Sequence, residues 1–207
     1  MSEKEIILIG GGGHCRSCID VIEAGNEFKI AGIVEQPGIN KNETILGYPV
    51  LGYDDDLEIL REQYEYALVT VGQIGSSSIR QKSFYQLKRL GFILPVIISP
   101  LAHVSKHAMI GEGTIIMHQV IVNTGASIGR NCILNTRCLI EHDVKIGDHT
   151  HISTAAVLNG GSIIGPGCFV GSNATIVQGV NLPENYFFKA AILIVSEKNG
   201  KAVENNL

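Results

Sequence analysis

His142 and Asp143 stand side by side in the stretch of the chain that carries its strongest chemical signal. The ordinary pKa of imidazole lies close to neutral pH, so a histidine suits the role of general base, and a neighbouring carboxylate can orient the ring. Gly160 follows three hexads after His142. If positions three hexads apart stack, this glycine opens a slot beside the imidazole, lined by backbone N–H groups that can stabilise an oxyanion. The trio therefore predicts a general base beside an oxyanion site.

A hexad repeat must position this trio. From Ile98 to Phe188 a large apolar residue returns at every sixth position, and a small or β-branched residue follows most of them by four. No α-helix has this period, and a sandwich of alternating strands would need a period of two. The repeat is typical of a parallel β-helix, in which three short strands close one coil and residues three hexads apart stack at roughly 4.8 Å. The large positions are Ile98, Val104, Ile110, Ile116, Val122, Ile128, Leu134, Ile140, Ile146, Ile152, Leu158, Ile164, Val170, Ile176, Leu182 and Phe188.

His142 could also be a solvated surface residue with no catalytic role. The other histidines of the repeat lack the combination of a following aspartate and a stacked glycine that His142 has. His118 occupies the same place in its hexad but has Thr136, not glycine, at the stacked position one coil later. His151 lies half a coil from His142, so the two cannot bind one ligand atom within a protomer, although neighbouring solenoids could bring them to a common ligand. Surface positions are expected for His103, His107 and His149.

The segment 1–97 predicts a small parallel α/β domain, because apolar strand patterns alternate with helical ones. Strands are expected over 5–9, 29–34 and 66–71, and helices over 14–24, 54–62 and 76–90. The turn Gly10–Gly13 either serves only as a tight turn or presents N–H groups and a helix N-terminus to an anionic or hydroxyl-rich ligand. Cys15 stands where the third glycine of a dinucleotide fingerprint belongs, so we expect an acceptor and not nicotinamide in this domain.

Composition narrows the class of protein. The net charge is −4 and no run of Lys or Arg occurs, so nucleic acid and anionic membranes are poor partners. With no signal peptide and no apolar run of membrane-spanning length, we expect a soluble cytoplasmic protein. Cys15 and Cys18 have the C-x-x-C spacing of a redox pair, but the other sequence cues of that motif are missing. Small inward slots of the repeat are expected for Cys132, Cys138 and Cys168.

Two motifs carry a resemblance to a known family: the strand that leads into Gly10–His14, and the run Leu139–Ser153. Over about Glu5–Lys201 the chain resembles bacterial sugar acetyltransferases of the sialic acid O-acetyltransferase family, whose members include N-acetyltransferases of nucleotide-linked 4-amino-sugars. The resemblance implies a Rossmann-like sugar-nucleotide domain over residues 1–97. A left-handed parallel β-helix of hexapeptide repeats with a C-terminal tail would follow over 98–207. It also implies a homotrimer in surface glycan biosynthesis.

The resemblance further implies roles for individual residues. His142 would take a proton from the acceptor amine or hydroxyl, Asp143 would raise its basicity, and the Gly160 amide would stabilise the tetrahedral intermediate. Transfer from acetyl-CoA would be direct, with neither a metal nor a covalent enzyme intermediate. An acetyl-CoA cleft between protomers would be lined by His151, Gly160, Ser172 and Ala190. The sugar nucleotide would be held by Gly12, Gly13, His14, Glu35, Gln36 and Gly72.

Two departures from the family pattern affect the ligands. Glu35-Gln36 replaces the usual pair of aspartates, and the usual G-x-P-A segment is absent near the C-terminus, where the chain reads Glu204–Leu207. The first departure leaves the identity of the nucleotide and of the sugar undetermined. The second implies different contacts to the far end of coenzyme A.

Three other functions stay open. A relative of this kind can O-acetylate a free sugar, and a non-catalytic solenoid can serve as a scaffold. A γ-type carbonic anhydrase uses the same solenoid with three zinc-binding histidines. The half-coil offset between His142 and His151, and the glycine slot, argue against the zinc enzyme.

Overall fold

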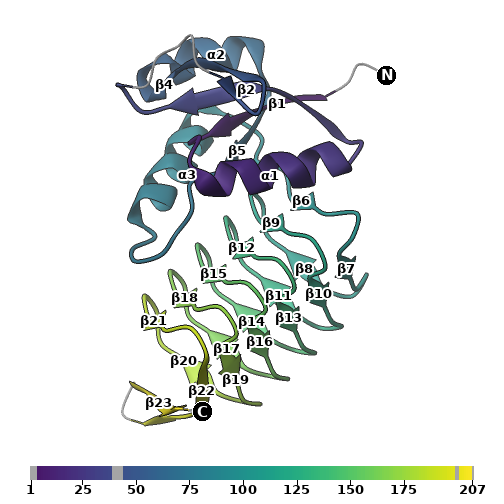
Figure 1. Ribbon diagram of the computed structural model, residues 1–207, viewed down its shortest axis with the longest axis vertical. Helices are drawn as coiled ribbons and strands as arrows, with labels where there is room; N and C mark the ends of the chain where they lie inside the picture. Colours follow the sequence, from purple (N-terminus) through teal and green to yellow (C-terminus); the bar gives the residue numbers. More distant parts are fainter. Residues whose placement is uncertain (1–3, 39–43, 199–200, 207) are drawn as a thin grey trace.

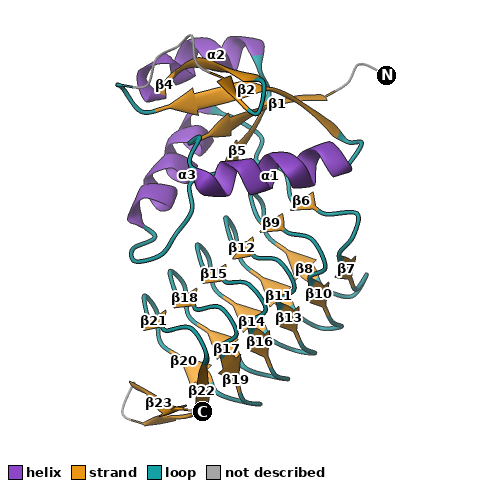
Figure 2. Cartoon of the chain, in the orientation of Figure 1, coloured by secondary structure: helices purple, strands orange, loops and turns teal. Residues whose placement is uncertain are grey.

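An α/β head packs on a solenoid of short parallel strands, as Figure 1 shows with the head at the top. The computed structural model describes residues 4–38, 44–198 and 201–206. In Figure 2 the described helices all belong to the head, whereas the solenoid consists of strands and loops. This order confirms the predicted fold class of an α/β domain followed by a parallel β-helix. Among the described residues, no helix has the length and apolarity that crossing a bilayer would require.

The head is a five-stranded sheet in the order β3-β4-β2-β1-β5, parallel except for the β3–β4 pair. Side chains alternate along β1: Ile6 and Leu8 pack with α1, and Ile7 and Ile9 pack with α2 and α3. The elements are β1 (Lys4–Ile9), α1 (Gly13–Ala24), β2 (Phe28–Glu35), β3 (Thr44–Ile45), β4 (Tyr48–Tyr53), the 3₁₀ turn η1 (Asp54–Asp56), α2 (Leu57–Gln63), β5 (Tyr66–Val69) and α3 (Ser78–Leu90).

The β3–β4 hairpin was not predicted from the sequence. Its second strand contains Pro49 and Gly52, residue types that are uncommon in strands. The strand nevertheless pairs with β2, and Gly52 leaves room there for the Asp56 carboxylate, which lies 2.6 Å from where a Cβ would be.

The solenoid has three sheets, and its strands pair at the predicted interval of three hexads, as in Ile121–Leu139–Val157. The head-facing sheet comprises β6 (Ile97–Ile98), β9 (Ile115–Ile116), β12 (Ile133–Leu134), β15 (His151–Ile152), β18 (Phe169–Val170) and β21 (Phe187–Phe188). The β7–β22 sheet comprises β7 (His103–Val104), β10 (Ile121–Val122), β13 (Leu139–Ile140), β16 (Val157–Leu158), β19 (Thr175–Ile176), β22 (Ile192–Lys198) and β23 (Lys201–Asn206). The β8–β20 sheet comprises β8 (Met109–Ile110), β11 (Ser127–Ile128), β14 (Lys145–Ile146), β17 (Ile163–Ile164) and β20 (Asn181–Leu182).

Inward side chains form one continuous core. The large positions from Ile116 onward are buried, and Cys132, Cys138 and Cys168 fill the small slots as predicted. Ile98 differs: it is 43% exposed, because it belongs to the first coil and no coil precedes it. α1 packs at this end, and its Ile19 belongs to the same apolar cluster as the solenoid core.

The corners of the solenoid share one backbone feature. One residue in each hexad from Gly113 onward has a positive φ, as at Asn131 (51°), Asp143 (60°) and His149 (60°). Asn, Asp and His are the side chains that tolerate this left-handed conformation best after glycine. The turn lets the chain change face within a few residues, and it places His142 at a corner.

His149 corrects an expectation. It was predicted at the surface, but it is 4% exposed, with Nδ1 2.9 Å from Asn131 Nδ2 and Nε2 3.2 Å from the Tyr85 hydroxyl. Tyr85 lies on α3, which packs over this corner, and burial lowers the pKa of His149. The hexad period carries no information about which corner the head will cover.

The C-terminal tail forms a hairpin of two strands. β22 extends the β7–β22 sheet by pairing with β19, and β23 folds back antiparallel on β22. Leu207, the end of the Glu204–Leu207 segment, lies outside the described residues.

A column of glycines, Gly111, Gly129, Gly147 and Gly165, marks where successive coils touch backbone to backbone. A Cβ on Gly165 would lie 2.5 Å from the Glu184 nitrogen and 2.6 Å from the Pro183 carbonyl carbon. Because backbone cannot rotate away, we expect Gly165→Ala to lower the free energy of unfolding by roughly 1–3 kcal/mol. Denaturant unfolding at one protein concentration measures this. Gly75→Ala is the control, since a Cβ there meets nothing within 4 Å; equal stability of both variants would contradict the close coil contact.

Candidate active site

His142 lies at the corner that follows β13, with Nδ1 3.0 Å from Asp143 Oδ2. This contact directs the Nδ1–H toward the carboxylate and leaves Nε2 with a free lone pair. The two side chains are 54% and 71% exposed. The imidazole is therefore open to solvent and to a ligand, with its basic nitrogen facing away from Asp143.

Gly160 covers the same imidazole one coil later. A Cβ on Gly160 would lie 2.5 Å from His142 Nε2 and 2.6 Å from Cε1, so a side chain at this position would occupy the space at the basic nitrogen. The Gly160 carbonyl accepts from the Gly179 amide at 3.0 Å, whereas the Gly160 amide donates to no group of the described residues. This geometry gives a free N–H donor beside a base, an arrangement that suits a developing oxyanion.

Asp143 is accommodated by another glycine. Gly125 lies one coil earlier, and a Cβ there would overlap Asp143 Oδ1. A glycine one coil before Asp143 and a glycine one coil after His142 thus make room for this pair on both sides.

A cavity of about 1060 Å³ opens between the head and the head-facing sheet. It brings together all the head residues predicted to bind the sugar nucleotide: Gly12, Gly13, His14, Glu35, Gln36 and Gly72. Its solenoid wall includes His151 and Ser172, which were predicted to line an acetyl-CoA cleft between protomers. Ala190, His142, Asp143 and Gly160 are not among its lining residues.

The four glycines of the first turn divide into two pairs. Gly10 has φ 95°, and a Cβ on it would lie 2.5 Å from Val71 Cγ2. Gly11 lies under the Glu35 carboxylate, which a Cβ would overlap. By contrast, a Cβ on Gly12 or Gly13 would meet nothing within 4 Å. Packing therefore requires the first two glycines, and the second two leave the α1 N-terminus open to the cavity.

His14 lines this cavity and has one unpaired ring nitrogen. Its Nε2 is buried and has no hydrogen-bond partner among the described residues. Burial, followed by the charge of Arg80, lowers the pKa of His14 to about 4, so the ring is neutral near pH 7. Gly72 allows the neighbouring loop to pass, because a Cβ there would lie 3.2 Å from the His14 Cβ.

His151 lies across the cavity from the glycine turn and is 6% exposed. Its Nδ1 lies 2.8 Å from the Gln73 carbonyl oxygen, its Nε2 lies 3.3 Å from Asn135 Nδ2, and its ring centroid lies 6.3 Å from that of His14. Burial is the main cause that lowers the pKa of His151 to about 3. The ring is therefore neutral and acts as a hydrogen-bonding group.

His118 takes part in a Ser–His–Asp arrangement that does not suit catalysis. Its Nδ1 lies 2.6 Å from Ser99 Oγ and its Nε2 lies 2.8 Å from Asp20 Oδ2. Ser99 is 1% exposed, and its oxygen already accepts the Leu101 amide at 3.0 Å. A substrate has no access to that hydroxyl, so the group serves as a contact between α1 and the solenoid.

The cysteine pair Cys15 and Cys18 is free and buried. Burial raises the pKa of Cys15 to about 11 and also raises that of Cys18, which opposes the thiolate needed for redox exchange. Within the described ranges, no three His, Cys, Asp or Glu side chains gather closely enough to hold a metal ion.

Sequence reasoning missed Gln73, Asn135 and Phe169 at the cavity. Gln73 belongs to the loop after β5, and loops at the carboxyl ends of parallel strands commonly bind ligands, so its location was a usable signal. Phe169 lies one coil after His151 on the outward side of the same sheet. Asn135 belongs to no motif.

Family models match both parts of the chain. The model of the PglD N-terminal domain matches residues 5–87, and the model of the bacterial transferase hexapeptide (six repeats) matches residues 143–178. The acetyltransferase domain of PglB from Neisseria gonorrhoeae is 30% identical, with 95% of this chain and 94% of that chain covered and a TM-score of 0.85. The chain belongs to this family of hexapeptide-repeat acetyltransferases.

Two further structures of this family are similar. The same Neisseria domain in complex with acetyl coenzyme A is 28% identical, covering 96% and 95% of the two chains with a TM-score of 0.86. A histidine-to-asparagine mutant of perosamine N-acetyltransferase from Caulobacter crescentus, in complex with CoA and GDP-perosamine, is 29% identical, covering 97% and 96% with a TM-score of 0.83. These matches confirm the resemblance, the left-handed β-helix and the assignment to acyltransferases.

The slot over His142 leads to a prediction. We expect Gly160→Val to abolish turnover and leave the fold intact, because the branched group would fill the space at Nε2 while meeting only a movable ring. Turnover and circular dichroism are measured together. Gly165→Ala provides the contrast, since its new Cβ would meet backbone. Near-normal turnover of Gly160→Val would show that the acetyl group does not occupy this slot.

Proposed function

We propose that this acetyltransferase moves an acetyl group from acetyl-CoA to the amine of a nucleotide-linked amino sugar. The observation that carries the proposal is His142, with its Nε2 under the bare backbone of Gly160 and its Nδ1 on Asp143. The acetyl-CoA and GDP-perosamine complexes of the relatives support the two ligand classes.

The reaction follows from these groups. His142 Nε2 takes a proton from the amine as its nitrogen attacks the thioester carbonyl, and the Gly160 N–H donates to the oxyanion that forms. When the intermediate collapses, the carbon–sulfur bond breaks and the imidazolium returns the proton to the coenzyme A thiolate. Asp143 stabilises the imidazolium between these two steps.

The acceptor is proposed to occupy the cavity beneath the head. The open amides of Gly12 and Gly13 at the start of α1 suit a diphosphate, and Lys82 on the same cavity wall adds positive charge. Glu35 is a carboxylate placed to accept from ribose hydroxyls. The His14 ring also lines this cavity and is a further contact for the sugar nucleotide.

A homotrimer is proposed because the two halves of the site lie apart in one protomer. His142 lies on the corner between the β7–β22 and β8–β20 sheets, which is the corner opposite the head-facing sheet. An acceptor in the cavity therefore needs the His142 of a neighbouring protomer. Ile121, Leu139 and Val157 form an outward apolar stripe on the β7–β22 sheet, whereas Lys145 stands on the adjacent sheet.

The proposed setting is the cytoplasm. All five cysteines are free, which suits a reducing compartment, and acetyl-CoA is supplied there.

Release of free coenzyme A tests the function: acetyl-CoA is offered with nucleotide-linked 4-amino-sugars, with their 4-hydroxy analogues and with free sialic acid. Thiol release with the amino sugar alone supports the proposal. Release only with hydroxyl acceptors would favour O-acetylation, and release with none would favour a scaffold.

The base is tested first. His142→Ala should lower kcat by roughly 10²- to 10⁴-fold, the usual contribution of a positioned general base, with little change in acetyl-CoA affinity. Asp143→Asn should lose less, because it removes an orienting charge and leaves the base. Steady-state kinetics measures both. If His118→Ala lost most of its activity while His142→Ala retained it, His118 and not His142 would be the general base.

The His151→Ala variant tests which of the two substrates His151 contacts. The family resemblance implied that it contacts acetyl-CoA, but its place opposite His14 in the cavity leads us to expect that His151→Ala raises the KM of the acceptor. The loss of one hydrogen bond suggests a rise of roughly 3- to 10-fold. Both KM values are measured with the other substrate saturating. A rise confined to acetyl-CoA would place the donor at this end of the cavity.

The apolar stripe predicts the assembly. Leu139→Glu should convert the trimer to monomers, because three buried carboxylates would face one another around the axis, and activity should fall with it. Light scattering at micromolar concentration measures the mass. Lys145→Glu, on the adjacent sheet, is the matched control. A wild-type chain that remains monomeric would contradict the proposed trimer.

A further inference from the structure

Arg80 is a charged residue in an unusual place. It lies on α3, is 1% exposed and contacts no carboxylate among the described residues. Its Nη1 donates to Gln73 Oε1 at 2.9 Å, and its Nη2 donates to the backbone and side-chain oxygens of Asn131. Its Nε has no partner among those residues. A buried charge without a counter-charge disfavours folding, which suggests that this one serves a purpose other than stability.

The guanidinium sets the direction of every hydrogen bond around it, because it can only donate. On the Gln73 side, Oε1 must face Arg80, so Nε2 points to the solenoid, where it lies 3.3 Å from the Gly167 oxygen and 3.2 Å from the Cys168 oxygen. Gln73 is thereby held at both ends of its amide. The loop between β5 and α3 is fastened to the head-facing sheet at this point.

The fastened loop determines the state of His151. The backbone oxygen of Gln73 can only accept, so His151 Nδ1 carries the proton at a distance of 2.8 Å. His151 Nε2 is then an acceptor, and Asn135 Nδ2 lies 3.3 Å from it. Asn135 is itself oriented, since its Oδ1 accepts the Thr136 amide at 2.8 Å. The hydrogen bonds thus select a single neutral tautomer of His151.

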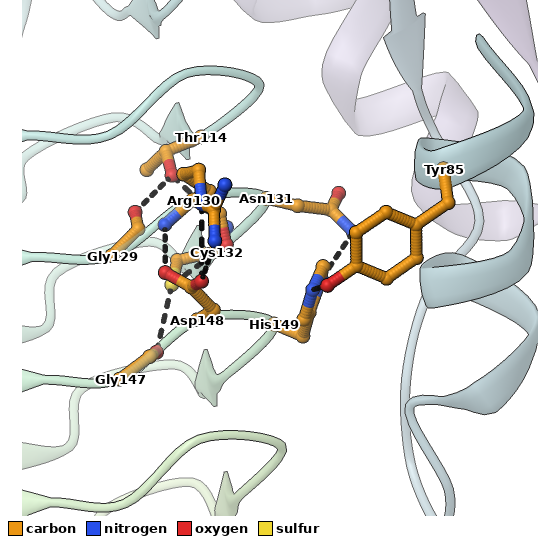
Figure 3. Close-up of polar contacts among 9 residues, drawn as sticks. All are labelled: Tyr85, Thr114, Gly129, Arg130, Asn131, Cys132, Gly147, Asp148 and His149. Atoms are coloured by element: carbon orange, nitrogen blue, oxygen red, sulfur yellow. Dashed lines mark hydrogen bonds and ion pairs between the residues drawn. The ribbon is translucent and has the colours of Figure 1, made fainter. Parts of the chain in front are cut away.

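A second arm of the network points away from the cavity. Because Arg80 donates to Asn131 Oδ1, the Asn131 Nδ2 faces His149 Nδ1, and His149 Nε2–H then faces the Tyr85 hydroxyl. Figure 3 shows Tyr85 reaching from its helix toward Asn131 and His149 at the solenoid corner. This arm joins the head to the solenoid without touching a residue that lines the cavity.

We propose that Arg80 is a positioning residue of the transfer reaction: through Gln73 it holds His151 as the tautomer with a bare Nε2, and a donor group of the sugar in the cavity takes the place of the long Asn135 contact on that nitrogen. The proposal rests on the proposed function only in placing the sugar there. Arg80 acts on the ligand through two other residues, so its loss should weaken acceptor binding and leave the proton transfer at His142 unchanged.

The state of the ring can be measured without substrate. In the full-length protein labelled with ¹⁵N-histidine, NMR should show the His151 ring, assigned by its loss in His151→Ala, with a protonated Nδ1 and a bare Nε2. Because burial keeps the pKa of His151 at about 3, this signature should not change from about pH 5 to 9. A proton on Nε2 in the wild-type protein would overturn the proposal.

Two variants test the link to Arg80. Arg80→Lys keeps the charge but cannot bridge Gln73 and Asn131, and Gln73→Met removes the amide while leaving the contact between Arg80 and Asn131. Each should turn His151 into a mixture of tautomers and raise the acceptor KM roughly 3- to 10-fold, with the acetyl-CoA KM unchanged. If Arg80→Lys does not fold, Gln73→Met decides. Wild-type tautomer and KM in Gln73→Met would refute the proposal.

Two controls separate positioning from structure. Gln81→Met makes the same replacement on α3, where the amide contacts Ser77 at 2.8 Å, and should leave His151 and both KM values unchanged. Tyr85→Phe breaks the second arm and should alter only the His149 signal. If Tyr85→Phe shifted His151 equally, general loosening of the head would explain the effect and Arg80 would have no specific part. If the protein had no transfer activity, the proposed function would be refuted. The tautomer measurement would still show whether Arg80 positions the His151 ring.

Discussion

Stacking of coils at a strict interval of three hexads is the constraint on which the rest of this structure depends. It buries Ile140 against Leu158 inside the solenoid, and on the outside it gives each corner residue a fixed neighbour in the next coil. Glycine consequently has two meanings. At Gly165 a side chain would strike the backbone of the next coil, whereas at Gly160 it would strike only the His142 ring. The first glycine permits the fold, and the second creates space for chemistry.

The same triangular cross-section separates base and cavity within one chain. One face of the prism is covered by the head, and the corner that carries His142 is the one that this face does not share. No side-chain rotation can close a gap set by the width of the solenoid. The proposed trimer removes the difficulty by placing one protomer's corner beside another's cavity, and it makes activity depend on assembly.

The sequence predicted the solenoid well because the six-residue period marks the apolar side chains that point into the core. It predicted poorly what covers the outside. His149 is buried by α3, and the β3–β4 and β22–β23 hairpins depend on tertiary pairing that no repeat encodes. Besides the location of Gln73, a second signal was present and unused: the outward positions of the head-facing sheet are rich in apolar and aromatic residues, namely Ile115, Ile133, His151, Phe169 and Phe187. Arg80 could not be found from the sequence, since its role arises only when head and solenoid meet.

Solvation divides the histidines into two kinds with different chemistry. His142 is half exposed and can exchange a proton with a substrate, as a general base must. His14 and His151 are buried, and burial together with the nearby charge of Arg80 lowers the pKa of both. A sugar amine arrives near neutral pH largely as an ammonium ion. Two imidazolium rings in the cavity would repel it, whereas two neutral rings do not. One buried cation, held out of reach of the ligand, therefore helps to keep these two rings neutral where the positively charged group must enter.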